Sequence, residues 1–567
     1  MLLSNSFLRI AMKRFFYTAT ILATLGFSSC QDFLETTPDD FVTPANYYRN
    51  EEEVNAALAG VYDILGRNQT YGRTLWWELD VADQFFDNRS NAIVDMSLNN
   101  YDATDTKVAG LWEALYLGIN RANMLLENLD KADMPQDAKT KVLGQAKFLR
   151  AYYYFLLVTN WGDVPLRLNA TASVKEVNVP KTASRTIYDF IVKEMEEAEA
   201  MVDVTGTKSP NSTTVSFKYN HSGRVTNTVV QGILARVNLK MAGAPLNDRS
   251  RYNEVIKWAT KVKESGLHSL NPSYKQIFIN HMQDRYDLQY RESMWEAEFA
   301  SAGPGLSYEE GSLGVTGGIN TGDPEIGYSY GIIQILKSHY DLYPVSGPRT
   351  VVRTNVTPAT IIVEDSRDTR RDWNIAPFYY SGKDTVAYSK DQIYNRKNGK
   401  WRRIYQLALP KNNNSSPANF PILRYADVLL MLAEAENAVN GPTALAKDAV
   451  NQVIRRAYAV TPDRNTPGAG TPDDVSEGVD QDQLLTIIQE ERAKELFSEG
   501  LRKFDLIRWG EYLYVMRALS SQIAVSAPSN LVYAGRAATN VTEKHLLLPI
   551  PTGETTLNNA IVQNSGW

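Results

Sequence analysis

Residues 420–436 read FPILRYADVLLMLAEAE, and this stretch predicts a helix. Past its single proline, at Pro421, the segment is mostly apolar and holds no glycine. Leu, Ala and Met dominate it, and these residues favour helix. We therefore predict a helix over residues 422–440.

Two segments share one spacing of small and large residues. Ala426, Leu430 and Ala433 follow the pattern Ala-x3-Leu-x2-Ala, which recurs over residues 235–242. This is the pattern of the second helix of a tetratricopeptide unit, where small residues let paired helices approach closely. Each segment is followed, after a turn, by another predicted helix. An ordinary helix pair with alanine at its contacts would give the same spacing, so both interpretations stay open.

The middle of the chain has a different composition. Nine glycines and two prolines fall within residues 303–331, which is typical of loops. Short β-like runs follow at residues 350–353 and 361–363. The other predicted helices span residues 112–126, 142–157, 187–202, 228–242, 252–265, 444–459 and 481–498.

These patterns predict a mainly α fold in a single domain over residues 51–567. Its helical parts are residues 51–300 and 421–567, and residues 301–420 form a loop-rich insert with short β-strands. Length alone would suggest several domains, but no linker divides the chain.

The N-terminal segment has the layout of a secretory signal. Lys13 and Arg14 precede an apolar run that ends near Gly26, and Cys30 follows two serines. The run is about a dozen residues long, whereas ~20 are needed to span a bilayer. We therefore predict a lipoprotein signal at residues 1–29.

Cys30 is the only cysteine of the chain. A free cysteine is usually a small buried hydrophobe, but this one stands where a bacterial lipoprotein carries its lipid. We predict that Cys30 is the lipid anchor and that residues 30–50 are a tether and lead-in. Met1 and Met12 both remain candidate starts.

The charge balance limits the class of partner. The formal net charge is −6, from 65 acidic and 59 basic residues, and no block of basic residues interrupts it. A nucleic-acid-binding protein would show a basic patch, so that class is excluded. No later apolar run approaches membrane-spanning length, and we expect membrane contact through the N-terminal lipid only.

The catalytic motifs are weak. Residues 327–331, GYSYG, fit the G-x-S-x-G pattern around Ser329, but that motif needs a preceding buried strand, which the sequence does not supply. The five histidines never stand at metal-ligand spacing, and no cysteine set accompanies them. We predict no catalytic residue, no metal site and no cofactor. Whether calcium assists binding stays open.

Several segments together resemble the SusD/RagB family of outer-membrane lipoproteins of Bacteroidetes. They follow the family's order from Cys30 to the C-terminal end. The segments are CQDFLETTP (30–38), LYLGINRAN (115–123), AKFLRAYYYFLL (146–157), WGDVP (161–165), FPILRYADVLLMLAEAE (420–436), EER (490–492), ELFSEGLRKFDLIRW (495–509) and LPIP (548–551).

The resemblance implies a SusD-like fold with tetratricopeptide-like helix pairs and a loop-rich, ligand-facing insert. It also implies a non-catalytic protein, anchored in the outer membrane and exposed at the cell surface. The implied task is to capture an oligosaccharide for a SusC-like TonB-dependent transporter. A peptide-binding lid of the RagB kind and an interaction scaffold without its own ligand remain the alternatives.

The charges of the matching segments have a structural interpretation. Arg150, Arg424 and the Glu/Arg cluster over residues 490–508 fall on or beside apolar helices. Charges close to a core are normally paired, so we expect ion pairs that hold the fold rather than ligand contacts.

Loops with aromatic residues should form the glycan-binding surface, because sugars present apolar C–H faces ringed by hydroxyls. One region is residues 76–101, and the second is the glycine-rich centre, which includes Tyr308. The tryptophans of the first region could equally pack under the loop. The candidates are Trp76, Trp77, Asp83, Phe86, Arg89, Asn100, Tyr101, Tyr328, Tyr330 and Trp373.

Overall fold

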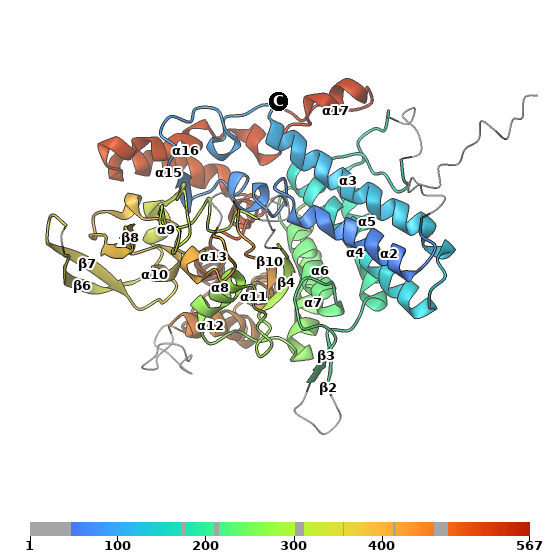
Figure 1. Ribbon diagram of the computed structural model, residues 1–567, viewed down its shortest axis with the longest axis horizontal. Coiled ribbons are helices and arrows are strands. Elements are labelled where there is room, and N and C mark those ends of the chain that lie inside the picture. Colours follow the sequence, from blue (N-terminus) through green and yellow to red (C-terminus); the bar gives the residue numbers. More distant parts are fainter. Residues whose placement is uncertain are drawn as a thin grey trace, which may run out of the picture. The chain divides into compact units, whose positions relative to one another are not determined.

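Helices make up the largest part of the computed structural model, as the sequence predicts (Figure 1). The chain from Tyr48 to Trp567 forms one compact unit. The predicted signal, Cys30 and the tether up to residue 46 lie outside the described residues, as does Tyr308. Within the described part, no helix is both long and apolar enough to cross a membrane. The structure describes residues 47–171, 177–208, 215–300, 311–354, 356–411, 415–458 and 474–567.

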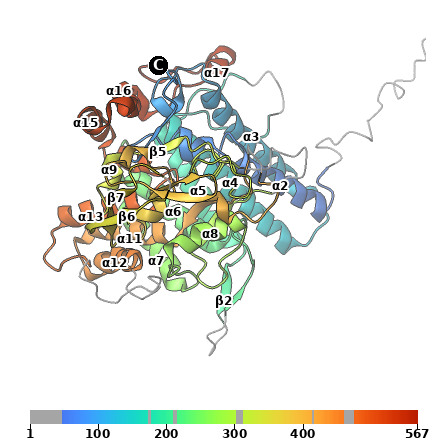
Figure 2. The same ribbon diagram turned by 60° about the vertical axis from the view of Figure 1, so that its left-hand side comes forward.

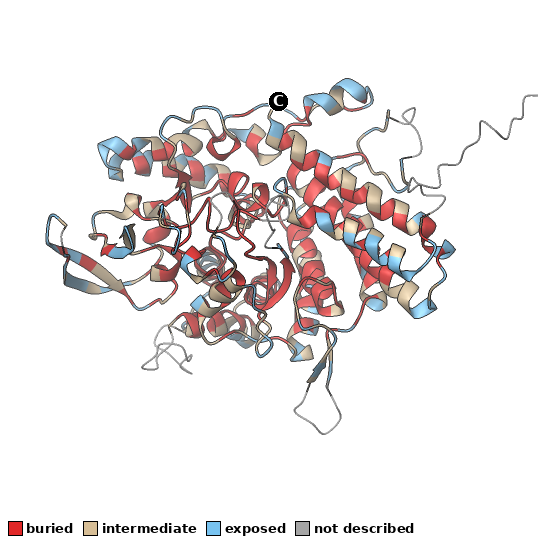
Figure 3. Ribbon diagram, viewed as in Figure 1, coloured by how far each residue is buried: buried red, intermediate tan, exposed pale blue. Residues whose placement is uncertain are grey.

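Consecutive helices of the N-terminal half pack against one another in chain order. They are α2 (Glu51–Gly66), α3 (Thr106–Asn128), α4 (Gln136–Trp161), α5 (Ser184–Met201), α6 (Asn227–Ala242) and α7 (Arg251–Ser265). Because α3 and α5 both cover α4, the second half of α4 is buried almost all round, as Figure 3 shows. The approach of α3 to α4 is close: a Cβ on Gly118 would lie 2.7 Å from the Tyr153 ring.

The helix pairs predicted from the Ala-x3-Leu-x2-Ala spacing are present. Helix α6 packs on α7, and α11 (Tyr425–Asn440) packs on α12 (Ala444–Ala457) and on α7. In both patterns the small and large residues are buried. The predicted start of the helix at residue 422 is wrong. Strand β10 (Phe420–Arg424) precedes α11 and pairs with β4 (Ser293–Ala297), and its hydrogen bonds replace the first helical turn.

The strands are short and join in pairs. The runs predicted near residues 350 and 361 belong to one antiparallel hairpin, in which Val351 faces Ile361. The pairs besides β10–β4 are β1 (Phe85–Asp87) with β5 (Ile333–Ile335), β2 (Gly206–Lys208) with β3 (Val215–Phe217), β6 (Val345–Val352) with β7 (Thr360–Ser366), and β8 (Phe378–Ser381) with β9 (Asp384–Ala387).

The C-terminal part returns to helix and closes over the loops that precede α3. Residues of α15 pack with Phe86, Tyr394 and Leu336 in one apolar cluster. Figure 2 shows α15 and α16 above α9. The remaining helices are α8 (Tyr274–Gln283), α9 (Lys337–Tyr340), α10 (Arg371–Asn374), α13 (Gln481–Glu495), α14 (Arg502–Arg508), α15 (Tyr512–Ser526), α16 (Arg536–Asn540) and α17 (Thr552–Leu557).

A cluster of buried charges joins β10 to α13 and the turn after it. Arg424 Nη1 lies 2.8 Å from Glu495, and its Nη2 lies 2.7 Å from Glu499. Arg456 also contacts Glu495, at 2.7 Å. Five cations face five anions here, so the charge is balanced, as burial requires. The members are Arg370, Lys400, Arg424, Arg456, Lys494, Glu292, Asp368, Glu491, Glu495 and Glu499.

The expectation that the charges of the matching segments hold the fold is confirmed at Arg424 and at two further positions. Arg150 pairs with Glu194 at 2.5 Å, and Arg492 bridges Asp427 and a carboxylate of α14. Glu490, at the start of the same segment, is exposed instead.

Candidate ligand-binding surface

Strands β1 and β5 bring together the two regions that the sequence singled out. Asp87 faces Ile333 in the antiparallel register. One residue further on, the Asn88 side chain donates to the Gly331 carbonyl at 2.8 Å. The start of loop 88–94 therefore lies beside the end of loop 320–332, although about 240 positions separate the two contacts in the chain. We call this the paired-loop surface.

Tyr328 and Tyr330 form the aromatic part of the paired-loop surface. Their ring centroids are 4.8 Å apart and the rings are perpendicular, at 89°. Tyr330 is 44% exposed and Tyr328 is half-buried. The Asn320 side chain donates to the Tyr330 carbonyl at 3.0 Å and fixes the turn that carries both rings. An apolar ring face thus stands in solvent beside amide groups.

Lys397 places a cation at Gly331, the residue that follows Tyr330 in the chain. It forms an isolated bridge with Gln334 of β5, and its ammonium donates to the Gly331 carbonyl at 2.8 Å. Burial lowers the pKa of Lys397 to about 8. No carboxylate of the described residues lies within ion-pair distance of it, so its remaining N–H groups are free to bind a hydroxyl or an anion.

Arg89 and Asn100 shape the other loop of the surface. Arg89 pairs with Asp87 and, at 3.1 Å, with Asp95. Asn100 is exposed, and its side chain donates to the Ile93 carbonyl at 2.7 Å. The loop tip consequently presents Ile93 to solvent, and the two predicted polar residues act chiefly on the loop's conformation.

Two residues near the C-terminus, which no sequence motif marks, also hold this loop. The Tyr533 hydroxyl donates to the Asn88 carbonyl at 3.1 Å, and Arg536 donates to the Ala92 carbonyl at 2.7 Å. No motif marks either position. Their hydrogen bonds to the loop depend on where α16 and the turn before it lie against the loop.

Five of the predicted ligand-contacting aromatics are buried, which corrects the expectation for them. Trp76 and Trp77 lie in a π-helical turn (Thr74–Glu78), and Arg73 covers the Trp77 ring at 4.6 Å. Phe86 belongs to the apolar cluster under α15. Tyr101 packs against Trp567, and Trp373 lies beneath Arg402. These rings fill the interior under the loops, which was the alternative interpretation of the tryptophans.

Asp83 also has a structural partner. Both of its carboxylate oxygens accept hydrogen bonds from Arg502, each at 2.8 Å. A bidentate pair of this kind fixes geometry. Asp83 thus ties the segment before β1 to α14.

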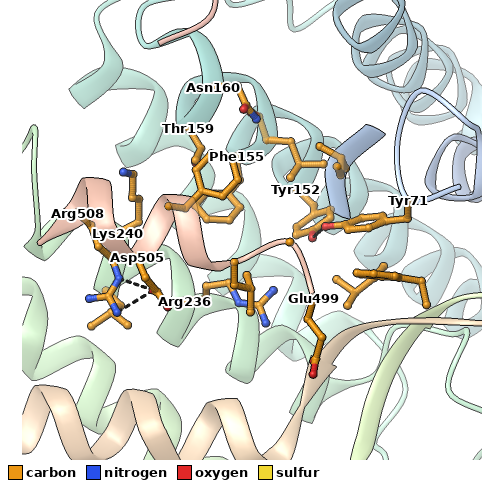
Figure 4. Close-up of a pocket in the computed structure, with 18 of the residues that line it drawn as sticks. Tyr71, Tyr152, Phe155, Thr159, Asn160, Arg236, Lys240, Glu499, Asp505 and Arg508 are labelled. Atoms are coloured by element: carbon orange, nitrogen blue, oxygen red, sulfur yellow. Dashed lines mark hydrogen bonds and ion pairs between the residues drawn. The ribbon is translucent and has the colours of Figure 1, made fainter. Parts of the chain in front are cut away.

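A small cavity lies elsewhere, between α4, α6, β10 and residues 499–508 (Figure 4). Its accessible volume is about 80 Å³, well below the ~300 Å³ of small ligand sites. Tyr71 and Tyr152 face it from one side and Lys240 from another. The cavity is too small for a sugar ring.

Ser329 of the G-x-S-x-G match is buried, and its hydroxyl donates to the Val315 carbonyl at 3.2 Å. It lies in an isolated bridge with Thr321 and not on a turn from a strand into a helix. The geometry that the motif needs is therefore missing at this position. Over the described ranges, no three His, Cys, Asp or Glu side chains gather as a metal-binding group.

Comparison with known proteins gives consistent matches over most of the chain. Residues 292–567 match the sequence model of the SusD family, and residues 32–223 match a family described as starch-binding and associating with the outer membrane. A SusD-like protein, P25, of Formosa agariphila is 25% identical, over 94% of this chain and 95% of that protein.

Solved structures show the same similarity. The crystal structure of a SusD homologue from Bacteroides thetaiotaomicron superposes with a TM-score of 0.79 at 26% identity, over 92% of this chain and 98% of that one. Surface glycan-binding protein A from Bacteroides fluxus gives a TM-score of 0.65 at 20% identity, over 92% and 100%. The second match concerns the fold alone.

Proposed function

The chain belongs to the SusD/RagB family, and from that premise we propose that it binds a glycan on the paired-loop surface and delivers it to a SusC-like TonB-dependent transporter. Glycan binding is supported by the starch-binding description of one matching family and by the name of the glycan-binding structural neighbour. Delivery to a transporter follows from the family's role in nutrient uptake.

The exposed Tyr330, followed in the chain by the Gly331 whose carbonyl binds Lys397, is the observation that carries the assignment to this surface. A sugar ring can stack its C–H face on Tyr330 while its hydroxyls meet the Lys397 ammonium and the amide of Asn320. The Asn320 Nδ2 already donates to two backbone carbonyls, so its Oδ1 is the atom that can accept from a sugar hydroxyl. An aromatic face next to such polar groups is the combination that glycan recognition needs. Tyr328, perpendicular to Tyr330, holds that ring at a fixed angle.

The membrane attachment is part of the same proposal. Cys30 carries the lipid, and the binding unit from Tyr48 onward stands off the outer membrane on the tether. An anchored binding protein stays beside a transporter in the same membrane, so captured ligand reaches it without diffusing away.

Titration calorimetry against a panel of neutral oligosaccharides, acidic oligosaccharides and peptides tests the proposal. We expect at least one glycan to bind and Tyr330→Ala to weaken its binding about tenfold, or ~1.4 kcal/mol. Tyr514→Ala is the matched control, because Tyr514 is 76% exposed on α15, outside the surface. Glycan binding by neither the protein nor its transporter complex would refute the proposal, and binding of peptides alone would favour a lid of the RagB kind.

A further inference from the structure

A second cleft lies between the hairpins β6–β7 and β8–β9, at the left of Figure 1. Its volume is about 890 Å³, within the ~300–1,000 Å³ of ligand sites. Val351, Val363, Val386 and Phe378 contribute apolar walls. The cleft shares no lining residue with the paired-loop surface.

Two guanidinium groups line this cleft from its buried side. Arg371 and Arg396 are each 1% exposed. Both lie against the ring of Tyr340, with centroid distances of 5.4 Å and 5.0 Å. The side chains come from α10 and from the segment before Lys397, so separate parts of the chain bring two positive charges to one ring.

The hydrogen bonds of these groups are incomplete. Arg371 donates through Nε to Asp372 at 2.8 Å and through Nη2 to the Glu364 carbonyl at 2.5 Å, but its buried Nη1 has no acceptor among the described residues. Arg396 has a single long bond, 3.4 Å to the Ser389 carbonyl, and its buried Nε has none. The Tyr340 hydroxyl is also without a partner in that part of the chain.

All three unsatisfied groups can donate a hydrogen bond. A buried polar group without a partner is destabilising and needs an explanation. An anion in the cleft can accept from the two guanidinium groups that line it, whereas a second donor or a cation cannot; Tyr340 is not a lining residue. The missing acceptors, together with the two guanidinium charges, therefore point to an anionic group.

Arginines and carboxylates line the cleft in equal number, four of each, but they are not all paired with one another. No described carboxylate lies within ion-pair distance of Arg396 or of Arg353, another lining residue, which binds the Pro358 carbonyl. Two lining carboxylates already have partners, since Asp372 pairs with Arg371 and Asp365 with Arg349. The other two lining carboxylates are Glu364 and Asp384.

We propose that this cleft binds an oxyanion borne on a sugar, either a sulfate ester or a uronate carboxylate, through Arg371 and Arg396. Guanidinium groups bind both oxyanions through paired N–H donors, which suits a flat or tetrahedral acceptor. The apolar walls leave room for the sugar that carries the charge. The sugar part rests on the proposed function, whereas oxyanion binding stands without it.

Inorganic sulfate is the first probe, titrated calorimetrically into the full-length protein against chloride at matched ionic strength. We expect sulfate to bind, and Arg396→Gln to weaken binding at least tenfold. Because a buried arginine can be required for folding, Thr385→Glu provides a second variant: Thr385 is exposed and lines the cleft, so a carboxylate there repels the anion. Thr360→Glu, exposed on β7 but outside the cleft, is the control and should bind sulfate normally.

The proposal is wrong if the wild-type protein does not bind sulfate. It is also wrong if both Arg396→Gln and Thr385→Glu still bind sulfate normally. A sulfated carrageenan tetrasaccharide, which has no carboxylate, trigalacturonate and neutral maltotetraose then separate the two sources of the oxyanion. Tighter binding of the first identifies a sulfate ester, and tighter binding of the second a carboxylate. If sulfate binds while Tyr330→Ala changes no glycan affinity, the proposed function fails and this inference stands.

Discussion

At the scale of single residues, Lys240 is an unusual buried charge. It faces the small cavity of Figure 4. Among the described residues, its ammonium donates a hydrogen bond only to the Ala244 carbonyl, at 3.3 Å. Burial, and then the nearby Arg508 guanidinium, lower the pKa of Lys240 from 10.5 to about 7. The amine is therefore protonated more easily in the unfolded chain than in the folded one. Below pH 10.5, this difference favours the unfolded chain and lowers the free energy of unfolding.

We expect Lys240→Met to stabilise the protein at pH 7 by up to about 4 kcal/mol, at roughly 1.4 kcal/mol per pKa unit. The wild type gains stability as the pH rises from about 7 toward 10.5, because the unfolded amine then also loses its proton. Urea unfolding at pH 7 and at pH 10 should show that the two proteins differ less in free energy of unfolding at the higher pH. Lys193→Met, on exposed α5 surface, is the control. A difference that does not change with pH would contradict this explanation.

The buried ion pairs behave in the opposite way, because their charges are satisfied. Removing one partner leaves the others uncompensated in the interior. We expect Arg424→Met to destabilise by about 3–5 kcal/mol, since it strands the carboxylates of Glu495 and Glu499. Arg349→Met breaks only an exposed pair with Asp365 and should leave the urea midpoint almost unchanged. Equal effects of the two variants would show that the cluster does not hold the fold.

At the scale of elements, helix contacts depend on where glycine stands. Gly118 of α3 meets the buried Tyr153 ring of α4, whereas Gly60 of α2 has no atom within 4 Å of its absent Cβ. We expect Gly118→Ala to destabilise by about 1–3 kcal/mol through overpacking. Gly60→Ala should stabilise by about 0.5–1 kcal/mol, because alanine favours helix. Thermal unfolding compares the two, and stabilisation by both variants would mean that α3 can move away from α4.

The elements themselves were largely predictable, because helix periodicity is a local property of the sequence. The exceptions have non-local causes. Residues 422–424 look helical by composition but form β10, since β4 offers a pairing edge more than 120 residues earlier. In the same way, β1 and β5 are each three residues long, too short to stand out in the sequence.

At the scale of the whole molecule, the sequence predicted which loops form the candidate surface better than it predicted which of their residues are exposed. Tyr328 and Tyr330 stand in a glycine-rich loop that cannot cover them, and they reach solvent. Trp76 and Trp77 carry the same aromatic signal, but both are buried, and Arg73 covers the Trp77 ring. Composition cannot distinguish a ring that packs from a ring that binds, because both are apolar; only the tertiary contacts do.

The proposed anchor at Cys30 also belongs to this scale, because a lipid there would act on the position of the protein and not on its fold. We expect Cys30→Ala to leave thermal stability and glycan affinity unchanged and to shift the protein from the membrane fraction to the soluble one. Immunoblotting of fractionated cells measures the shift, with Ser29→Ala as the neighbouring control. Loss of ligand affinity in the Cys30→Ala protein would show that the anchor does more than attach the chain.

The pairing of β1 with β5, together with the contacts from Tyr533 and Arg536, has a consequence for synthesis and export. Its contributors stand near residues 88, 331 and 533, so no partial chain contains the whole recognition surface. Contacts this distant in sequence form late in folding. If the chain is exported from its N-terminus, the proposed binding surface is complete only after the last part of the chain has been delivered. A molecule that binds ligand at this surface must therefore contain the complete chain up to the residues near position 533.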